Sequence, residues 1–288
     1  MAFVGLQSVG ATTTECSPGK WALTFDDGPH PSISLEILSL LRKNNAKATF
    51  FVVGKNVADN PGILRQIYED GHEIGVHTWN HLDLTSLNTN QIRKEIGSTV
   101  DVIYQTVGVR PTLARPPFGN TNELVRGIMK EFGLEGITWN VDSNDWRYAQ
   151  EYHDSYEAGK FTEEELFSHL KDKDPSTTGV ISLQHDVHEA SVYITGEVIR
   201  GIRTKGFSLT TVKQCISGPN NSYTVPPAPT ATTSSSLNST VTIGNANETA
   251  ISGTVTNTSS YTDLVTDSET VTNSNATLTP PSKYPPRV

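Results

Sequence analysis

From residue 21 onwards, short runs of β-prone apolar residues alternate with longer stretches whose apolar residues recur at helical spacing. WALTF at 21–25 and ATFFVV at 48–53 are typical of strands, and SLEILSLLRKN at 34–44, between them, is typical of a helix. Strands that are apolar on both faces and are joined by helices belong to parallel sheets. The alternation therefore predicts an α/β domain of repeated strand–helix units closed into a barrel, with a doubly wound open sheet as the alternative.

The same patterns place the remaining elements. We expect strands at 21–25, 48–53, 73–77, 112–115, 135–141 and 180–185. We expect helices at 34–44, 60–71, 89–107, 121–132 and 189–205, and one more that begins at a capping box formed by Thr162 and Glu165. Residues 147–161 show neither the apolar pattern of a strand nor the spacing of a helix, which indicates a loop.

Composition changes sharply after residue 217. Residues 218–288 contain 27 Ser and Thr, eight Pro and only three aromatic residues, whereas every Trp, His and Cys lies before residue 216. A segment of this composition cannot bury enough apolar surface to form a core. We therefore divide the chain into a flexible N-terminal extension (1–14), one folded domain (15–217) and a disordered Ser/Thr-rich tail (218–288).

Charge and hydropathy exclude two classes of protein. The chain has 22 basic and 31 acidic residues and no basic cluster, so it lacks the surface of a nucleic-acid binder. No stretch approaches the ~18 consecutive apolar residues of a membrane-spanning helix. We expect a monomer without a transmembrane segment.

Cys16 and Cys215 bracket the folded domain, and a disulfide between them would close its two ends and imply an oxidising compartment. Two unrelated buried thiols are the alternative. The first 15 residues lack the basic region of a signal peptide, so either a leader is missing or the chain stays inside the cell. We favour a missing leader and a secreted or cell-wall protein.

The tail holds every Asn-x-Ser/Thr sequence of the chain, which indicates a glycosylated stalk. Chance alone would give about three such sites in a segment of this composition, so the five that occur are mild support. The C-terminus lacks the hydrophobic tail that a glycolipid anchor requires. The expected glycosylation sites are Asn220, Asn238, Asn247, Asn257 and Asn275.

Polar residues follow several of the expected strands, where parallel folds gather their reactive groups. Asp26 and Asp27 end the first strand, although a capped turn would also explain them. His77 and His81 follow the third strand with the i,i+4 spacing that places two imidazoles on one face of a helical turn, as a metal site requires. Eight histidines would give ~0.2 such pairs by chance, so the spacing alone is weak evidence for a metal site.

Five short sequences carry a resemblance to a known family: TFDDGP (24–29), HTWNH (77–81), RPPFG (115–119), DSNDW (142–146) and LQH (183–185). In this order they resemble the five motifs of the polysaccharide deacetylases, carbohydrate esterase family 4, and most closely those of the fungal chitin deacetylases. The resemblance covers about residues 20–215. It implies a distorted (β/α) barrel with a shallow, open groove.

By this resemblance, Asp27, His77 and His81 are expected to hold a divalent metal, zinc or alternatively cobalt. Two imidazoles and one carboxylate suit zinc chemically. Asp26 is expected to be the general base, and Arg115 matches the arginine that orients it. Without the resemblance, Arg115 would be taken for a solvated residue of a Pro-rich loop.

The resemblance also assigns the groups that would act on the leaving amine and the oxyanion. His185 corresponds to the general acid and Asp145 to its carboxylate partner. The backbone amide of Phe118 is expected to stabilise the oxyanion, and a Tyr is more frequent in the family at this position. Trp146 and Leu183 are expected to form the walls of the acetyl-methyl pocket.

The function implied is metal-dependent hydrolysis of the N-acetyl groups of N-acetylglucosamine units in chitin, giving chitosan and acetate. The alternatives are deacetylation of peptidoglycan or xylan by the same chemistry, or a non-catalytic carbohydrate-binding wall protein. The expected loop at 147–161 would contact the substrate. The histidines outside the motifs are expected at surface or packing positions: His30, His72, His153, His169 and His188.

Overall fold

The computed structural model describes residues 11–217. The first ten residues of the expected N-terminal extension and the whole expected tail lie outside this part of the chain. The five expected glycosylation sites also lie outside the described residues: Asn220, Asn238, Asn247, Asn257 and Asn275.

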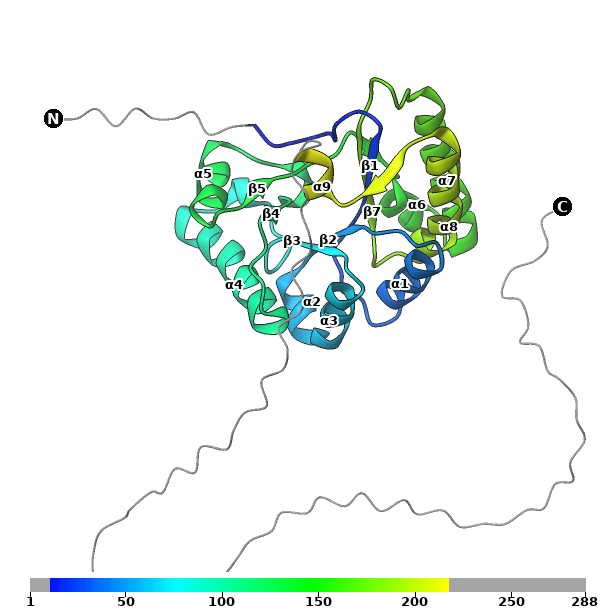
Figure 1. Cartoon of the computed structure of the whole chain (residues 1–288). Coiled ribbons are helices and arrows are strands. Elements are labelled where there is room, and N and C mark those ends of the chain that lie inside the picture. The colour runs from blue at the N-terminus through cyan, green and yellow to red at the C-terminus, as the bar shows by residue number, and fades with distance from the viewer. Residues whose placement is uncertain (1–10, 218–288) are drawn as a thin grey trace, which may run out of the picture. The chain divides into compact units, whose positions relative to one another are not determined.

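The described residues form one sheet of eight strands, and every pair of neighbouring strands in it is parallel. The strand order is β5-β4-β3-β2-β1-β7-β6, and β8 pairs with the start of β1. Figure 1 shows the sheet curled inside a layer of helices. The strands are β1 (Lys20–Asp26), β2 (Thr49–Val52), β3 (Glu73–Val76), β4 (Leu113–Ala114), β5 (Glu135–Gly136), β6 (Val141–Asp142), β7 (Val180–His185) and β8 (Ser208–Thr210).

The two edges of the sheet belong to consecutive strands, β5 and β6. Only residues 137–140 join them, and a chain of this length spans no more than about 18 Å. The edges must therefore approach each other, so the sheet is a distorted barrel with a gap, which confirms the expected fold class. The single strand expected at 135–141 was wrong, because 137–140 leaves the sheet to cross this gap.

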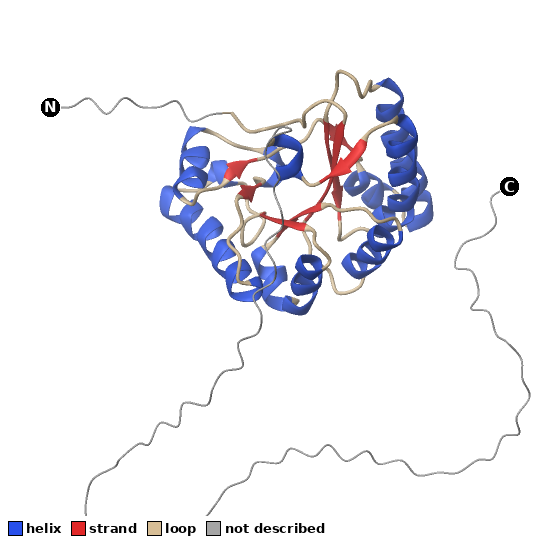
Figure 2. Cartoon of the chain, in the orientation of Figure 1, coloured by secondary structure: helices blue, strands red, loops and turns tan. Residues whose placement is uncertain are grey.

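Helices follow most of the strands and cover the outside of the sheet, as Figure 2 shows. A short helix, α2, was not expected from the sequence. Nine α-helices lie in the described residues, with 3-10 turns η1 (Leu84–Ser86) and η2 (Pro117–Gly119) between them. The α-helices are α1 (Ile33–Lys43), α2 (Gly54–Asp59), α3 (Pro61–Glu69), α4 (Thr89–Val107), α5 (Glu123–Glu131), α6 (Asp145–Glu151), α7 (Ser155–Asp172), α8 (Glu189–Lys205) and α9 (Val212–Ile216).

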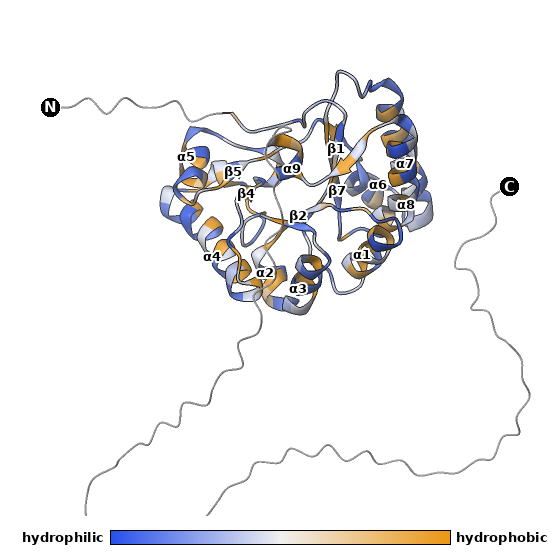
Figure 3. Ribbon diagram, viewed as in Figure 1, coloured by the Kyte–Doolittle hydropathy of each residue, from blue (hydrophilic) through white to orange (hydrophobic). Residues whose placement is uncertain are grey.

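Alternation along β1 explains both the core and the position of the polar groups. Trp21, Leu23 and Phe25 belong to the main hydrophobic core between sheet and helices, whereas Ala22 belongs to a smaller cluster inside the barrel. Figure 3 shows that the helices carry both hydrophobic and hydrophilic residues, as expected for helices with one buried face. Successive strand residues face opposite sides, so Asp26 shares the inner side with Ala22 at the carboxyl end of the strand.

The region between β6 and β7 differs most from expectation. Residues 147–161, expected to be a loop, lie in α6 and the first turns of α7, apart from the short link at 152–154. The capping box at Thr162 was also wrong: α7 begins at Ser155, capped by the Asp154 carboxylate, and the buried Thr162 hydroxyl donates to the Ala158 carbonyl within the helix. Aromatic stacking stabilises this region, with Phe161 stacked on Tyr148 and Tyr152.

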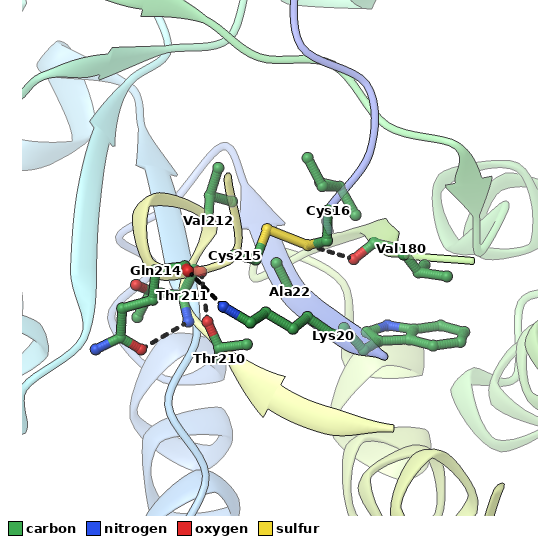
Figure 4. The surroundings of a disulfide bond; sticks show 12 residues. Cys16, Lys20, Ala22, Val180, Thr210, Thr211, Val212, Gln214 and Cys215 are labelled. Carbon is green, nitrogen blue, oxygen red and sulfur yellow. Dashed lines mark hydrogen bonds between the residues drawn. A yellow bond between two sulfur atoms is a disulfide. The ribbon is translucent and has the colours of Figure 1, made fainter. Parts of the chain in front are cut away.

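At the amino-terminal end of the barrel, Cys16 and Cys215 form the expected disulfide across a sequence separation of 199 residues. Figure 4 shows the bond joining the segment before β1 to α9. Val212 and Cys215 of α9 belong to the cluster inside the barrel, so α9 closes this end. Thr13, which we assigned to the extension, pairs with Ile137. None of the helices in residues 11–217 is long and apolar enough to cross a membrane.

Candidate active site

The residues of the five motifs converge at the carboxyl ends of the strands. Asp26 is the last residue of β1 and His185 the last residue of β7, and these two residues are paired in the register of the sheet. His77 follows β3, and Arg115 follows β4. Because all neighbouring strands are parallel, their carboxyl ends meet at one end of the barrel.

Asp27, His77 and His81 form a cluster whose ligand atoms lie within 4.8 Å of one another. Asp27 Oδ1 is 3.4 Å from Nε2 of each histidine. This oxygen is buried and has no hydrogen-bond partner among the described residues. An unpaired carboxylate oxygen that faces two imidazole nitrogens fits a divalent metal, so the residues present suit the ion expected from the resemblance.

The two imidazoles are presented differently. His77 is buried, and its Nδ1 lies 2.7 Å from the Arg115 carbonyl oxygen. A proton on Nδ1 donates to this carbonyl and leaves the Nε2 lone pair directed at Asp27. His81 is half-buried, and its backbone N–H donates to the Thr78 hydroxyl at 3.1 Å.

The electrostatics of the cluster favour most of the ligand forms that a metal requires. Burial alone would raise the pKa of Asp27, but the adjacent His77 imidazole, with the charges of His185 and His81, holds it below its ordinary value. Burial, with the neighbouring His77, lowers the pKa of His81. The pKa of His77 is raised, against the effect of burial, by Asp26 and Asp27, so a proton competes with a metal at His77.

The loops that carry these side chains adopt left-handed backbone conformations, which cost on the order of 1 kcal/mol or more for a residue with a side chain. Within residues 11–217 only one other non-glycine residue, Asn45, has a positive φ. The helical turn expected from the spacing of His77 and His81 was wrong, because these residues lie in a loop. The positive φ values are Asp27 (79°), Thr78 (65°), His81 (55°), Phe118 (60°) and Asn144 (53°).

Asp26 and Arg115 form a buried ion pair. Arg115 Nη1 donates to Asp26 Oδ1 at 2.7 Å and to the Thr24 hydroxyl at 2.7 Å. The guanidinium lies over the ring of Phe51 at 4.2 Å, and Arg115 is fully buried rather than solvated. Asp26 Oδ2 accepts no hydrogen bond from residues 11–217 and lies 3.7 Å from His77 Nε2, so it stays available beside the metal cluster.

Asp145 and His185 form a second buried pair. His185 Nδ1 lies 2.7 Å from Asp145 Oδ1, and the His185 backbone N–H donates to Oδ2 at 2.7 Å. The Trp146 N–H donates to Oδ1 at 2.8 Å, and the Ser191 hydroxyl donates to Oδ2. Both carboxylate oxygens are therefore occupied, and Asp145 orients the imidazole so that its Nε2 remains free.

The charge of His185 follows from this pairing. Burial alone would lower the pKa of the imidazole, but the Asp145 carboxylate, assisted by Asp27 and Asp26, raises it to about 10. The pKa of Asp145 is held below its ordinary value by His185 and Ser191, although burial opposes this. His185 is consequently a cation at neutral pH and can donate a proton from Nε2.

Phe118, Trp146 and Leu183 also lie at this end of the barrel. The ring of Phe118 packs edge-on against His81 with centroids 4.8 Å apart, and the Phe118 N–H donates no hydrogen bond to the described residues. The amide of this residue is therefore free to donate to a ligand. Phe118 is 63% exposed and Trp146 is 40% exposed, whereas Leu183 is buried.

The sequence analysis missed Asp186, which follows His185 directly. Its buried carboxylate accepts the Gly28 N–H at 2.9 Å and the Ser34 hydroxyl, and its own N–H donates to the Asp26 carbonyl at 3.2 Å. A Cβ at Gly28 would lie 2.0 Å from this carboxylate, so only glycine fits there. Asp186 therefore holds the turn that carries Asp26 and Asp27, and its adjacency to the LQH motif was the available signal.

Glu95 of α4 was also missed. Its Oε2 accepts the N–H groups of Trp79 and Asn80 at 2.9 and 2.8 Å, and its Oε1 accepts the Asn80 side-chain amide. These bonds hold the loop that positions His81. The signal was a carboxylate on the apolar face of a helix, between Ile92 and Ile96, where an unpaired Glu is costly.

Comparisons with known proteins agree with this geometry. The family model for polysaccharide deacetylase matches residues 14–137. The peptidoglycan-N-acetylglucosamine deacetylase PgdA of Listeria monocytogenes is 35% identical over 193 residues, which are 67% of this chain. The chain spans only 38% of that relative's length.

Two fungal proteins are similar over more of their length. A chitin deacetylase of Pestalotiopsis sp is 34% identical over 213 residues, covering 72% of this chain and 67% of the relative. The structure of the chitin deacetylase from Colletotrichum lindemuthianum superimposes with a TM-score of 0.67 at 28% identity, covering 75% of this chain and 96% of that one.

Proposed function

Because the chain belongs to the polysaccharide deacetylase family, we propose that it hydrolyses the N-acetyl groups of N-acetylglucosamine units in chitin and releases acetate. The observation that carries this proposal is that two carboxylate–cation pairs, Asp26–Arg115 and Asp145–His185, lie beside one cluster of metal ligands. A carbohydrate-binding wall protein would not need a base, an acid and a ligand set in one place.

Asp27, His77 and His81 would hold the metal, for which we propose zinc. When bound, a divalent metal polarises the acetyl carbonyl and lowers the pKa of a water molecule towards ~7. Asp26 would accept the proton of that water through Oδ2, the oxygen that Arg115 leaves unpaired. Arg115 would keep the carboxylate in this orientation through its bond to Oδ1.

His185 would protonate the departing amine, since an amine anion is too basic to leave without a proton. Asp145 would hold the imidazole in the correct tautomer and charge state. The free N–H of Phe118 would donate to the oxyanion as it forms. Trp146 and Leu183 would enclose the acetyl methyl group.

Chitin is proposed over other acetylated polymers because this chain matches 67% of the chitin deacetylase of Pestalotiopsis sp but only 38% of PgdA. Peptidoglycan is the second candidate, since PgdA is equally similar in identity. The Cys16–Cys215 disulfide supports a secreted or cell-wall location, because structural disulfides persist in oxidising compartments.

The test is acetate release from N-acetylglucosamine oligomers, compared with peptidoglycan fragments and acetylxylan. We expect release from the chitin oligomers, loss of release with a chelator, and recovery when zinc or cobalt is returned. Faster release from peptidoglycan would favour the second candidate. Retention on chitin without acetate release from any polymer would support a binding protein instead.

A further inference from the structure

One short segment, residues 51–56, makes hydrogen bonds to both of the loops that carry the candidate metal ligands. It runs from the end of β2 into α2, the short helix that the sequence did not predict. It contacts the turn after β1, which carries Asp27, and the loop after β3, which carries His77 and His81. The relative position of the three ligands therefore depends on this segment.

The loop of the two histidines is bound to this segment through main-chain groups. The His77 N–H donates to the Val52 carbonyl at 2.9 Å. The first N–H of α2, that of Gly54, donates to the Thr78 carbonyl at 2.9 Å, and the next one donates to the Trp79 carbonyl at 3.2 Å. These bonds give partners to N–H groups that a helix leaves unpaired at its start.

Gly54 sets how closely α2 approaches the histidine loop. A Cβ at this position would lie 2.5 Å from the Trp79 ring and 2.7 Å from the Thr99 hydroxyl oxygen. Both distances are shorter than a van der Waals contact, so only glycine fits here. The main chains of the segment and the loop can therefore bond to each other directly.

The turn that carries Asp27 is bound to the same segment, and here a side chain takes part. The Asp27 N–H donates to the Phe51 carbonyl at 3.2 Å, and the Gly28 carbonyl accepts the Val53 N–H at 3.0 Å. The side-chain amide of Asn56 donates to the Asp27 carbonyl at 2.7 Å. This carbonyl accepts no other hydrogen bond from the described residues.

The Asp27 backbone needs this support because it is left-handed, with a φ of 79°. A return to the ordinary region of φ would turn the side chain as well as the carbonyl, since both are attached to the same Cα. Asp27 Oδ1 would then no longer lie 3.4 Å from Nε2 of both His77 and His81. Phe51 binds the N–H of this residue and Asn56 binds its carbonyl, so together they oppose such a rotation.

We propose that Asn56 is a positioning residue of the metal site, whose bond to the Asp27 carbonyl keeps the Asp27 carboxylate directed at the ion. This inference rests on the proposed function, which supplies the metal. Asn56 acts through the main chain of Asp27 and is not itself a ligand. Replacing a residue that orients a metal ligand typically weakens metal binding by ~10–100-fold.

The experiment compares the zinc affinity of the full-length wild type with that of Asn56→Leu, by competition with a chelating indicator. Leucine keeps the branched shape of the side chain and removes the donor. Asn44→Leu is the matched control, because Asn44 is also half-buried and its side-chain amide also donates to a main-chain carbonyl, that of Leu40, at 2.9 Å. Asn44 lies at the carboxyl end of α1, outside the segment that contacts the ligand loops.

We expect the zinc dissociation constant to rise about tenfold in Asn56→Leu and to stay unchanged in Asn44→Leu. The visible absorption spectrum of the cobalt-loaded protein should change in Asn56→Leu, because it depends on the arrangement of the ligands. A loss of stability alone would leave the spectrum of the folded protein unchanged. Equal zinc affinity in Asn56→Leu and the wild type overturns the inference, as does an equal loss in the control. If Asn56→Leu does not fold, Asn56→Ala is judged by the same criteria.

The proposed function and the role of Asn56 can fail separately. If the wild type binds zinc but releases no acetate from any polymer, the proposed function fails and the zinc titration still decides the role of Asn56. If the wild type binds neither zinc nor cobalt, hydrogen exchange of the Asp27 backbone amide in the metal-free protein decides it. Exchange about tenfold faster in Asn56→Leu than in Asn44→Leu supports the positioning of Asp27 by Asn56, and equal exchange overturns it.

Discussion

Two buried carboxylates, Asp26 and Asp145, each lie 2.7 Å from a cationic partner on the two sides of the candidate site. The partner of Asp26 is Arg115, which carries a permanent charge and cannot give up a proton. The partner of Asp145 is His185, which can. The same type of group is therefore suited to different roles. The choice of cation fits the Asp26 side to accept a proton and the His185 side to donate one, as we propose.

The two carboxylates also differ in how many of their oxygens accept hydrogen bonds. Asp145 has hydrogen bonds at both oxygens, from His185, Trp146 and Ser191. Asp26 has them at Oδ1, while Oδ2 accepts none from the described residues. A carboxylate with a free oxygen can act on a ligand, whereas a fully bonded one can only orient its neighbour.

The largest effect is expected from Asp26→Asn, which removes the proton acceptor but keeps the shape of the Arg115 contact. We expect kcat/KM to fall about 10³-fold on N-acetylglucosamine oligomers and on an aryl acetate, because base catalysis contributes ~10²–10⁴. Metal content, measured by atomic spectroscopy, should stay unchanged. Asp101→Asn on the exposed face of α4 is the control. Loss of metal together with activity would contradict the separation of Asp26 from the ligand set.

The variant Asp145→Asn tests the comparison through the pH dependence of kcat/KM. His185 keeps its proton up to a pKa of about 10, so the rate should decline only as pH rises through that value. Without the carboxylate the pKa should return towards ~6.5, and kcat/KM at pH 8.5 should fall about 100-fold. An aryl acetate, whose leaving group needs no proton, should be much less affected. An equal loss of kcat/KM on the oligomers and on the aryl acetate would show that the Asp26 and Asp145 sides of the site do not have separate roles.

Asp186→Ala tests whether the base and metal ligand depend on the acid strand, because this carboxylate ties Gly28 to the end of β7. The buried Gly28 N–H would lose its acceptor, which costs about 1–3 kcal/mol. We expect zinc affinity to fall about 10-fold, as is typical when a residue that orients a metal ligand is replaced. Asp172→Ala at the end of α7 is the control. A lower melting temperature with unchanged zinc affinity would limit Asp186 to stability.

The smallest effect on catalysis is expected from Cys16→Ser/Cys215→Ser, at the opposite end of the barrel. Loss of the disulfide should lower the free energy of unfolding by about 2–5 kcal/mol, measured by denaturant titration. The kcat/KM of the folded enzyme should not change, because within residues 11–217 the hydrogen bonds and ion pairs of Asp26, Arg115 and His185 do not involve α9. A fall in kcat/KM well below the melting temperature would show that the two ends of the barrel are coupled.

Regular elements with clear periods were predictable from the sequence. The helix expected at 89–107 matches α4, which is capped by Asn88 and ended by Gly108 in a left-handed conformation. Residues 147–161 were not predictable in this way. The buried face of α7 does recur at helical spacing, but Ala158 and Thr162 are its first members and neither is a large apolar residue. Stacking among Tyr148, Tyr152 and Phe161 adds contacts that no periodic pattern indicates. The edge strands β5 and β6 have two residues each, too few for any period to show.

The sequence by itself determined the repeated strand–helix units, and it predicted the division at residue 217 and the side chains that we propose carry the chemistry, because these depend on local composition and order along the chain. Only the tertiary structure decided how those side chains meet. The left-handed turns at Asp27 and His81, the free oxygen of Asp26 and the contacts of Asp186 and Glu95 arise from segments distant in sequence. Such contacts leave no periodic signal, since their energy comes from partners that are adjacent only after folding.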